Sequence, residues 1–271
     1  MEGCLERSGA LSNWGKGEIM AGKRQLSPLE VFELLATDAR KLIRFADVLD
    51  NTRANRMRRE LREGIGGVLR IPKKRQGEMD CVESDDLFVI LKPGTVLDRE
   101  DFDAHPSFLR QAIVAACAAF ETYLADRTED EVRGCIRRKE PLPPRLAKVP
   151  MTVGQWDTIN QGYKYRRRGI TEVVLQDYLA KESSTAASRV GELLSLCGVD
   201  KGMAKLDAYR KVKKGTTKDH LTVITDRRND IAHSGDRVGR GRRKITSEEV
   251  ESYLSQLESI VHAIEAVFSD R

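Results

Sequence analysis

The stretch ITDRRNDIAHSGD, residues 224–236, closes a segment whose apolar residues repeat with the period of a helix. Leu221, Ile224 and Ile231 fall on one stripe of such a helix, and most residues between them are polar. Gly235 comes next, and glycine is the residue that most often ends a helix. The sequence therefore predicts an amphipathic helix over residues 216–234 that stops at a Ser-Gly break.

Arg228 and His233 are the two residues of this helix with the greatest chemical interest. At roughly 100° per residue they stand about 140° apart around the helix axis, on neighbouring flanks. An arginine side chain is long enough to bridge that difference, so both head groups could reach one cleft. The alternative is an ordinary surface arginine and a histidine that caps the helix end.

Apolar residues repeat with helical spacing along most of the remaining chain. The segment SPLE, residues 27–30, offers an N-cap serine, a proline at the first helical position and a glutamate that completes a capping box. Thr246 and Glu249 form the same signature before the last helix. Further helices are expected at about residues 52–63, 106–139, 154–162, 170–181, 185–197 and 201–212, the first of them ended by GIGG.

The one convincing strand is LFVIL, residues 87–91, which Pro93 and Gly94 stop. Together these patterns predict an all-α fold: a helical bundle with extra N-terminal helices and at most a short β element. We divide the chain into a flexible tail at residues 1–25, an N-terminal helical extension with the short strand at 26–100, and a helical domain at 101–271.

The composition, with 40% hydrophobic and 33% charged residues, is that of a soluble globular protein. No apolar run approaches the roughly 20 residues that span a bilayer, and the N-terminal stretch lacks the apolar centre of a signal peptide. We therefore expect a cytoplasmic protein that does not contact membranes. Five scattered cysteines fit a reducing compartment, and the histidines lack ligand spacing, so neither a metal nor a cofactor is predicted.

The six residues RNDIAH, 228–233, resemble the Arg-X4-to-6-His signature of HEPN domains, in the form in which a polar residue, here Asn229, follows the arginine. The apolar segment AIVAACAAFETYLADR, residues 112–127, is similar to the early HEPN helix that carries an internal glutamate. ITSEEVESYLSQLESIVHAIEAVF, residues 245–268, looks like the closing HEPN helix. The resemblance is closest to the branch grouped with RiboL-PSP and related bacterial defence proteins, and it covers residues 101–271.

This resemblance implies a HEPN-type bundle that acts as a metal-independent endoribonuclease in a homodimer, where two motifs meet in one cleft. The ribose 2′-hydroxyl attacks its own 3′-phosphate, which requires a base and an acid. His233 suits the proton transfers, Arg228 the charge of the phosphorane, and Asn229 the orientation of phosphate or ribose. RNA would be the substrate, and the protein would serve as a toxin or defence effector, with an antitoxin or defence-system protein as a possible partner.

Glu121 is a fourth candidate, because it and Arg110 are the only charged residues between Phe108 and Ala125. A carboxylate within so apolar a helix is unfavourable unless it is paired. We hypothesise that Glu121 forms an ion pair with Arg228 and aims it. The alternative is a solvent-facing residue at the helix edge.

Two basic clusters are candidates for RNA binding. The segment RVGRGRRK begins four residues after His233 and holds five cations and no acid; these are Arg237, Arg240, Arg242, Arg243 and Lys244. Phosphate binding beside the site requires such charges. In YKYRRRG, residues 163–169, Tyr163 and Tyr165 could stack on unpaired bases. The alternative for both clusters is a solvated loop.

Two other functions remain open. A helical module of the same fold could bind RNA or a partner protein without cutting anything. It could also be a scaffold subunit of a larger complex that neither binds nor cuts RNA.

Overall fold

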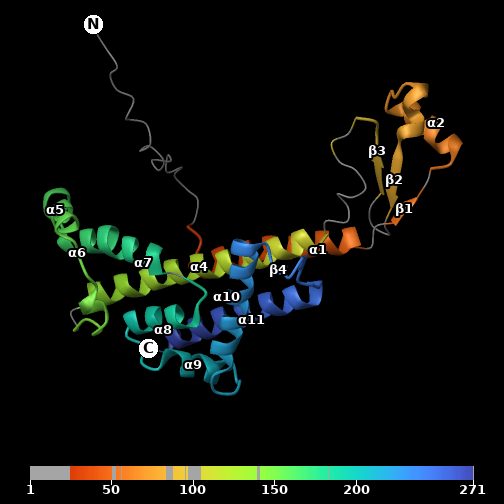
Figure 1. Cartoon of the computed structure of the whole chain (residues 1–271). Coiled ribbons are helices and arrows are strands. Elements are labelled where there is room, and N and C mark those ends of the chain that lie inside the picture. Colours follow the sequence, from red (N-terminus) through yellow and green to blue (C-terminus); the bar gives the residue numbers. More distant parts are fainter. Residues whose placement is uncertain are drawn as a thin grey trace, which may run out of the picture.

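The computed structural model describes residues 25–50, 53–55, 57–83, 88–94, 96, 105–138, 141–182 and 184–270. The tail predicted at residues 1–25 lies outside this part except for Gln25. Three long helices run side by side: α1 (Pro28–Asp50), α4 (His105–Arg137) and α11 (Ser247–Ser269) (Figure 1). Helix α10 (Thr216–Ser234) crosses them, and α8 (Ala187–Leu196) and α9 (Gly202–Tyr209) pack beside it.

These helices share one hydrophobic core, which confirms the predicted all-α bundle. Its members are apolar side chains at helical spacing, buried on the facing stripes of α1, α4, α8, α9, α10 and α11. Phe32 of α1 and Tyr123 of α4 meet with ring centroids 5.9 Å apart in its centre. Helix α1 belongs to the predicted N-terminal extension, yet it packs into the same core as residues 105–270.

The capping box predicted at α1 is confirmed, and one of the two hydrogen bonds of the capping box predicted at α11 is present. The backbone N–H of Ser27 donates to the Glu30 carboxylate at 2.7 Å, and the N–H of Glu30 donates to the Ser27 hydroxyl at 3.3 Å. At α11, the N–H of Glu249 donates to the Thr246 hydroxyl at 3.2 Å. Each cap satisfies donors at a helix start that have no partner within the helix.

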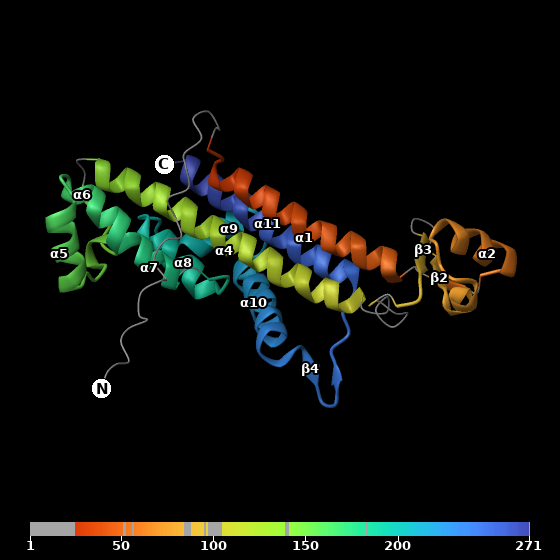
Figure 2. The same ribbon diagram turned by 90° about the horizontal axis from the view of Figure 1, so that it is seen from above.

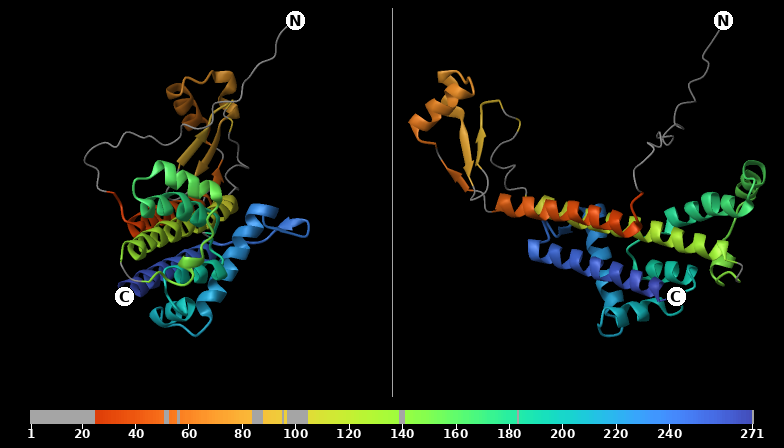
Figure 3. Two further views of the ribbon diagram at one scale, coloured as in Figure 1. Left: turned by 90° about the vertical axis from the view of Figure 1, so that its left-hand side faces the viewer. Right: turned by 180° about the vertical axis from the view of Figure 1, so that it is seen from behind.

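The described residues between Arg53 and Leu91 form a small separate lobe. Strands β1 (Arg53–Asn55), β2 (Asp80–Glu83) and β3 (Phe88–Leu91) pair antiparallel in that order, beside α2 (Arg59–Val68) and the 3-10 turn η1 (Lys73–Glu78). Figures 1 and 3 show the lobe beyond the ends of α1 and α4. Its own apolar cluster is centred on Met57, Met79 and Cys81.

The lobe confirms the strand predicted at 87–91 over residues 88–91 and corrects the helix predicted at 52–63. That helix starts later, because residues 53–55 pair with β2 instead, and it continues through GIGG to Val68. The glycines therefore do not end the helix. Gly66 instead lies where the helix packs closely against the turn η1. A Cβ atom at Gly66 would lie 2.6 Å from the Gln76 side chain, so a larger residue there would force that side chain to shift.

The segment between α4 and α8 forms one end of the molecule. It contains the 3-10 turn η2 (Leu146–Lys148), α5 (Val153–Gly162), α6 (Arg166–Gly169), the π-helix η3 (Ile170–Leu175) and α7 (Gln176–Glu182). The helix predicted at 170–181 is thus one continuous helical run from Arg166 whose middle is a π-helix.

Helix α4 is long and apolar enough, by length and composition alone, to cross a membrane. However, 56% of that apolar stretch is buried inside the bundle, where α4 packs against α1, α10 and α11. The core helix of a soluble protein has the same properties.

Candidate active site

Helix α10 has the predicted bounds and carries both residues of the motif. Gly235 and Asp236 both take the left-handed conformation, with φ of 63° and 64°, so the chain turns sharply after Ser234. The N–H of Asp236 returns to the carbonyl of Asp230 at 3.0 Å. His233 therefore lies in the last turn of the helix, and its side chain is exposed.

Arg228 is held from two sides. Its Nη2 atom lies 3.5 Å from Oε2 of Glu121, and its Nη1 atom donates to Oδ1 of Asn229 at 3.1 Å. The hypothesised ion pair between α4 and α10 is therefore present. One third of the Arg228 side chain stays exposed (33%), so the guanidinium is oriented by the protein while it still faces solvent.

Glu121 is itself fixed by the loop before α8. Its Oε1 atom accepts a hydrogen bond from the backbone N–H of Thr185 at 3.3 Å, and the hydroxyl of Thr225 donates to the buried hydroxyl of Thr185 at 3.0 Å. The carboxylate is 22% exposed, which rules out the alternative of a fully solvent-facing residue. Helix α4, the loop before α8 and helix α10 thus meet next to Arg228, and their contacts limit how its side chain can move.

Cys117 lies beside this ion pair, one helical turn before Glu121. Burial, together with the charge of Glu121, raises the pKa of the Cys117 thiol to about 12, against the smaller opposing effect of Arg228. The thiol therefore stays protonated near neutral pH. Cys117 is a small, fully buried core side chain and not a nucleophile.

A buried charge cluster lies directly behind the motif, and sequence reasoning missed it. The carboxylate of Asp236, which is 1% exposed, pairs with Nε of Arg110 at 2.9 Å and with Nη2 of Arg227 at 3.1 Å. We call these three residues the Arg-Asp-Arg cluster. The sequence held one signal for it: Arg110 is the sole cation in an apolar stretch, and it needed a partner.

The Arg-Asp-Arg cluster fixes the segment that follows α10. Arg110 donates from Nη2 to the carbonyl of Arg243 at 2.8 Å, and Arg227 donates from Nη2 to the carbonyl of Lys244 at 3.0 Å. The N–H of Arg243 also donates to the carbonyl of Asp236 at 2.9 Å. Both ends of residues 236–244 are therefore attached to the bundle.

Between these anchors the chain forms a short hairpin of β4 (Arg237–Val238) and β5 (Gly241–Arg242). It projects from the bundle at the end of α10, as Figure 2 shows. The five predicted cations of this segment are all exposed: Arg237, Arg240, Arg242, Arg243 and Lys244. We call residues 237–244 the basic hairpin. Because it follows α10 directly, its charges lie next to the helix end that carries His233.

The second predicted cluster lies elsewhere. Arg167 of α6 donates to the carbonyl of Ile136 at 3.3 Å, near the C-terminal end of α4, whereas the basic hairpin is attached at Arg110 near its start. At 1.5 Å per residue, these two positions on α4 are about 39 Å apart. The structure therefore does not bring Tyr163 and Tyr165 to the surface of Arg228 and His233 within one chain.

The two tyrosines also differ in exposure. Tyr165 is 68% exposed and lies under the ammonium group of Lys164 at 5.8 Å, whereas Tyr163 is partly buried. Only Tyr165 presents a ring to solvent on which a base could stack.

In the part of the chain that the structure describes, no group of three His, Cys, Asp or Glu side chains is placed to hold a metal ion. The predicted absence of a metal cofactor in catalysis stays a prediction. The chemistry available at this surface is that of an oriented guanidinium, an amide, an exposed imidazole and a row of cations.

Comparison with known proteins agrees with this geometry. The family model for RiboL-PSP-HEPN matches residues 91–270, which include every helix from α4 to α11 and the whole motif. No curated protein and no solved structure matches the chain. HEPN domains are RNA-related modules and are often ribonucleases. Because the match covers more than half of the sequence, this chain belongs to the RiboL-PSP-HEPN family.

Proposed function

We propose that this protein is an endoribonuclease of the HEPN type that acts as a homodimer without a metal ion and serves as a toxin or antiphage-defence effector. The proposal rests on the contacts and the partial exposure of the Arg228 guanidinium group. This group is paired with Glu121 at 3.5 Å and bonded to Asn229 at 3.1 Å, yet it keeps a face open to solvent. An oriented cation with an open face is suited to hold a phosphate bidentately.

The reaction needs only positioning and proton transfer. The 2′-oxygen of a ribose forms a bond to the adjacent phosphorus, the bond from phosphorus to the 5′-oxygen breaks, and a 2′,3′-cyclic phosphate remains. Extra negative charge builds up on the phosphorane between these steps, and Arg228 stabilises it. A base removes the 2′-hydroxyl proton, and an acid protonates the leaving 5′-oxygen.

His233 is the group proposed for the proton transfers. It is exposed at the end of α10, and histidine is the side chain that most often transfers protons in catalysis near neutral pH. In the proposed dimer two copies of the motif face each other across one cleft, so one His233 acts as base and the other as acid. The exposure of His233 in the single chain supports this arrangement, because a second surface is needed to exclude water from the reaction.

The basic hairpin is proposed to hold the RNA backbone beside the cleft. Replacing Arg240 and Arg242 together with alanine removes two exposed cations without touching the Arg-Asp-Arg cluster. We expect weaker RNA binding and a slope of log affinity against log salt that is smaller by about 1.4, since each phosphate contact on a single strand contributes about 0.7. Fluorescence anisotropy at several salt concentrations measures both quantities.

The matched control replaces Lys213 and Lys214, two exposed cations before the opposite end of α10. This double variant should keep the wild-type slope. If both double variants lower the slope equally, the basic hairpin has no special part in RNA binding.

Glu121 is proposed as a positioning residue. In Glu121→Gln the amide oxygen can still accept from Thr185, but the charge that holds Arg228 is lost. We expect RNA cleavage to fall by about 10²-fold, because misplacement of a catalytic group by about 1 Å has that effect. RNA affinity and melting temperature should change little, and Glu121→Asp should recover part of the activity. A single-turnover cleavage assay measures the first quantity.

Glu258 provides the control for this substitution. It pairs with Arg40 and has a similar exposure, 24% against 22% for Glu121. Glu258→Gln should cleave RNA like the wild type. Equal losses in the two variants would mean that any lost ion pair in the bundle lowers activity, and the positioning role would be rejected.

Purified protein and a labelled single-stranded RNA test the function as a whole. Cutting of the RNA, together with growth arrest when the protein is expressed in bacteria, is the expected result. RNA that is bound with steep salt dependence but never cut would favour a non-catalytic binding module instead.

A further inference from the structure

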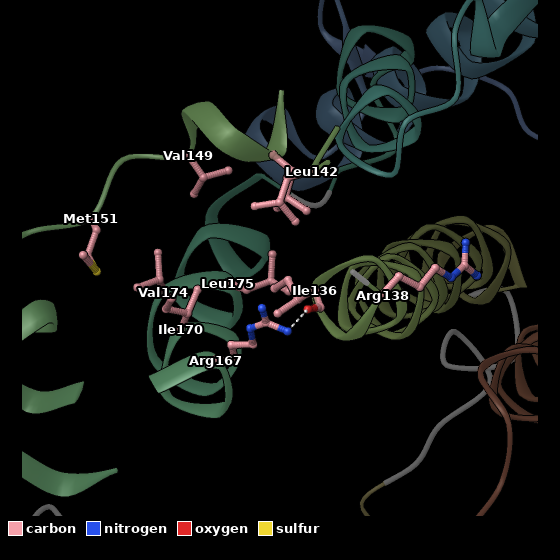
Figure 4. A pocket seen from close by; sticks show the side chains of 10 residues that line it. Ile136, Arg138, Leu142, Val149, Met151, Arg167, Ile170, Val174 and Leu175 are labelled. Atoms are coloured by element: carbon pink, nitrogen blue, oxygen red, sulfur yellow. Dashed lines mark hydrogen bonds between the residues drawn. The ribbon is translucent and has the colours of Figure 1, made fainter. Parts of the chain in front are cut away.

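An apolar groove lies at the C-terminal end of α4, beside the π-helix η3 (Figure 4). It has a volume of about 370 Å³ and lies between the C-terminal end of α4, the segment after it and the π-helix η3. Its apolar lining includes Ile136, Leu142, Met151, Ile170, Val174 and Leu175. Arg138 and Arg167 belong to the same lining. Figure 4 shows the guanidinium group of Arg167 beside Ile136, whereas that of Arg138 points away from the apolar side chains.

Several large apolar side chains of the groove are exposed to solvent and are not part of the buried core. Val174 and Leu175 are buried and belong to its floor, but Leu142 and Met151 are each 44% exposed and Ile170 is 38% exposed. Single exposed apolar residues are ordinary on protein surfaces. Several that converge on one concave surface indicate an interaction site.

The charge around the groove identifies the kind of partner. Residues 133–170 contain ten Lys or Arg residues and only two Asp or Glu residues. Three of these cations, Arg133, Arg145 and Arg168, pair with glutamates outside this segment, so the remaining cations carry the excess of positive charge near the groove. Arg138 and Arg167 form no ion pair within the described residues, and Arg167 only donates to the carbonyl of Ile136 at 3.3 Å. Both side chains are exposed. Arg167 presents its charge beside the groove, and the long side chain of Arg138 is free to turn toward a carboxylate bound there, because exposed side chains change rotamer on the ps–ns timescale.

We propose that this groove binds an acidic, amphipathic segment of a partner protein. Apolar side chains of that segment fill the space between Leu142, Met151 and Ile170, and its carboxylates pair with Arg138 and Arg167. The aliphatic lining argues against RNA as the occupant, because unpaired bases stack on aromatic rings and no described residue of the groove lining has one. The exposed ring of Tyr165 lies in a neighbouring hollow and not in this groove.

The position of the groove has a consequence for regulation. It lies near the C-terminal end of α4, about 39 Å along that helix from the attachment of the basic hairpin. A partner bound here leaves the surface of Arg228 and His233 of the same chain uncovered. The proposed interaction therefore does not depend on RNA cleavage, and it holds or fails independently of the proposed function.

A peptide library displayed on phage and selected on the purified protein tests the proposal. We expect the enriched peptides to combine acidic residues with two or more large apolar residues. Their affinity, measured by fluorescence anisotropy, should fall at least tenfold in Leu142→Ser/Met151→Ser and in Arg138→Glu/Arg167→Glu. Leu34→Ser makes the same substitution at a 55% exposed leucine of α1, outside the groove, and should leave the peptide affinity unchanged.

Several outcomes would overturn the proposal. These are a selection without enrichment, enriched peptides without acids, and peptides whose affinity is the same for wild type and both groove variants. Labelled single-stranded RNA is titrated in parallel with the same proteins. If RNA binding falls in the arginine variant while no peptide binds, the surface contacts RNA and the proposed partner is wrong. Melting curves show whether each variant is folded, and the two double variants change different surface residues, so one unfolded variant does not prevent the test.

Discussion

Replacement of His233 by alanine is expected to lower the rate of RNA cleavage by about 10²–10⁴-fold, the usual contribution of a general acid or base. The imidazole is exposed at the end of α10, where Gly235 turns the chain away from it. No neighbouring group has to rearrange when it is removed, so the melting temperature should stay within the range of ordinary surface changes. A single-turnover assay with a labelled RNA measures the rate.

His262→Ala is the matched control, because His262 is also an exposed histidine on a long helix and lies outside the motif. This variant should cleave at the wild-type rate. Full activity in His233→Ala would remove the histidine from the mechanism.

Arg228 should behave differently from His233 under the same assay. Arg228→Ala is expected to lower cleavage by about 10²–10³-fold, because it removes a charge that stabilises the phosphorane. It also leaves Glu121 without its partner at 3.5 Å. Arg228→Lys keeps the charge but loses the planar fork, so an intermediate rate is expected. A lysine variant with the full wild-type rate would contradict bidentate binding of the phosphate.

The largest loss of stability is expected from Asp236→Ala. Removing this carboxylate leaves the buried guanidinium groups of Arg110 and Arg227 without their shared counter-ion. Arg227 already has two buried atoms, Nε and Nη1, without a hydrogen-bond partner among the described residues. Breaking a buried ion pair by removing one partner typically destabilises a protein by about 3–5 kcal/mol. Thermal unfolding should show a melting temperature lower by roughly 6–20 °C.

Asp226→Ala is the control for this effect. Asp226 lies on the same helix but is exposed, so its removal should change the free energy of unfolding by no more than about 0.5 kcal/mol. If Asp236→Ala melts within 1 °C or so of the wild type, the Arg-Asp-Arg cluster does not hold the end of α10. An Asp236→Asn variant keeps the shape of the side chain and shows how much of the loss is due to charge.

Local patterns sufficed to predict the bundle. The bounds of α10 follow from three apolar residues on one stripe and a glycine at the end, and the capping hydrogen bonds at α1 and α11 join residues only three positions apart. Glu121 could be singled out because a carboxylate in an apolar helix needs a partner. These features depend on neighbours in sequence, so a single sequence contains the information.

Features built from distant residues could not be predicted in the same way. Arg110 and Asp236 are 126 positions apart. The residues around either one do not indicate that the other is its partner. The strand β1 forms at Arg53–Asn55 because β2 pairs with it, which overrides the helical pattern of the segment. The sequence favours the basic cluster at residues 237–244 over the one at 163–169 because it follows His233 closely, but it does not show that their attachment points on α4 are about 39 Å apart.

The chemistry of the RNA ends made in excess EDTA tests the central claim most directly. We expect wild-type protein to leave a 2′,3′-cyclic phosphate on the upstream fragment and a 5′-hydroxyl on the downstream fragment, and His233→Ala to leave the RNA intact. Mass spectrometry of the fragments distinguishes these ends from others. Cutting that requires a divalent ion, or that leaves 5′-phosphate ends, would contradict attack by the 2′-hydroxyl at a site made of Arg228 and His233.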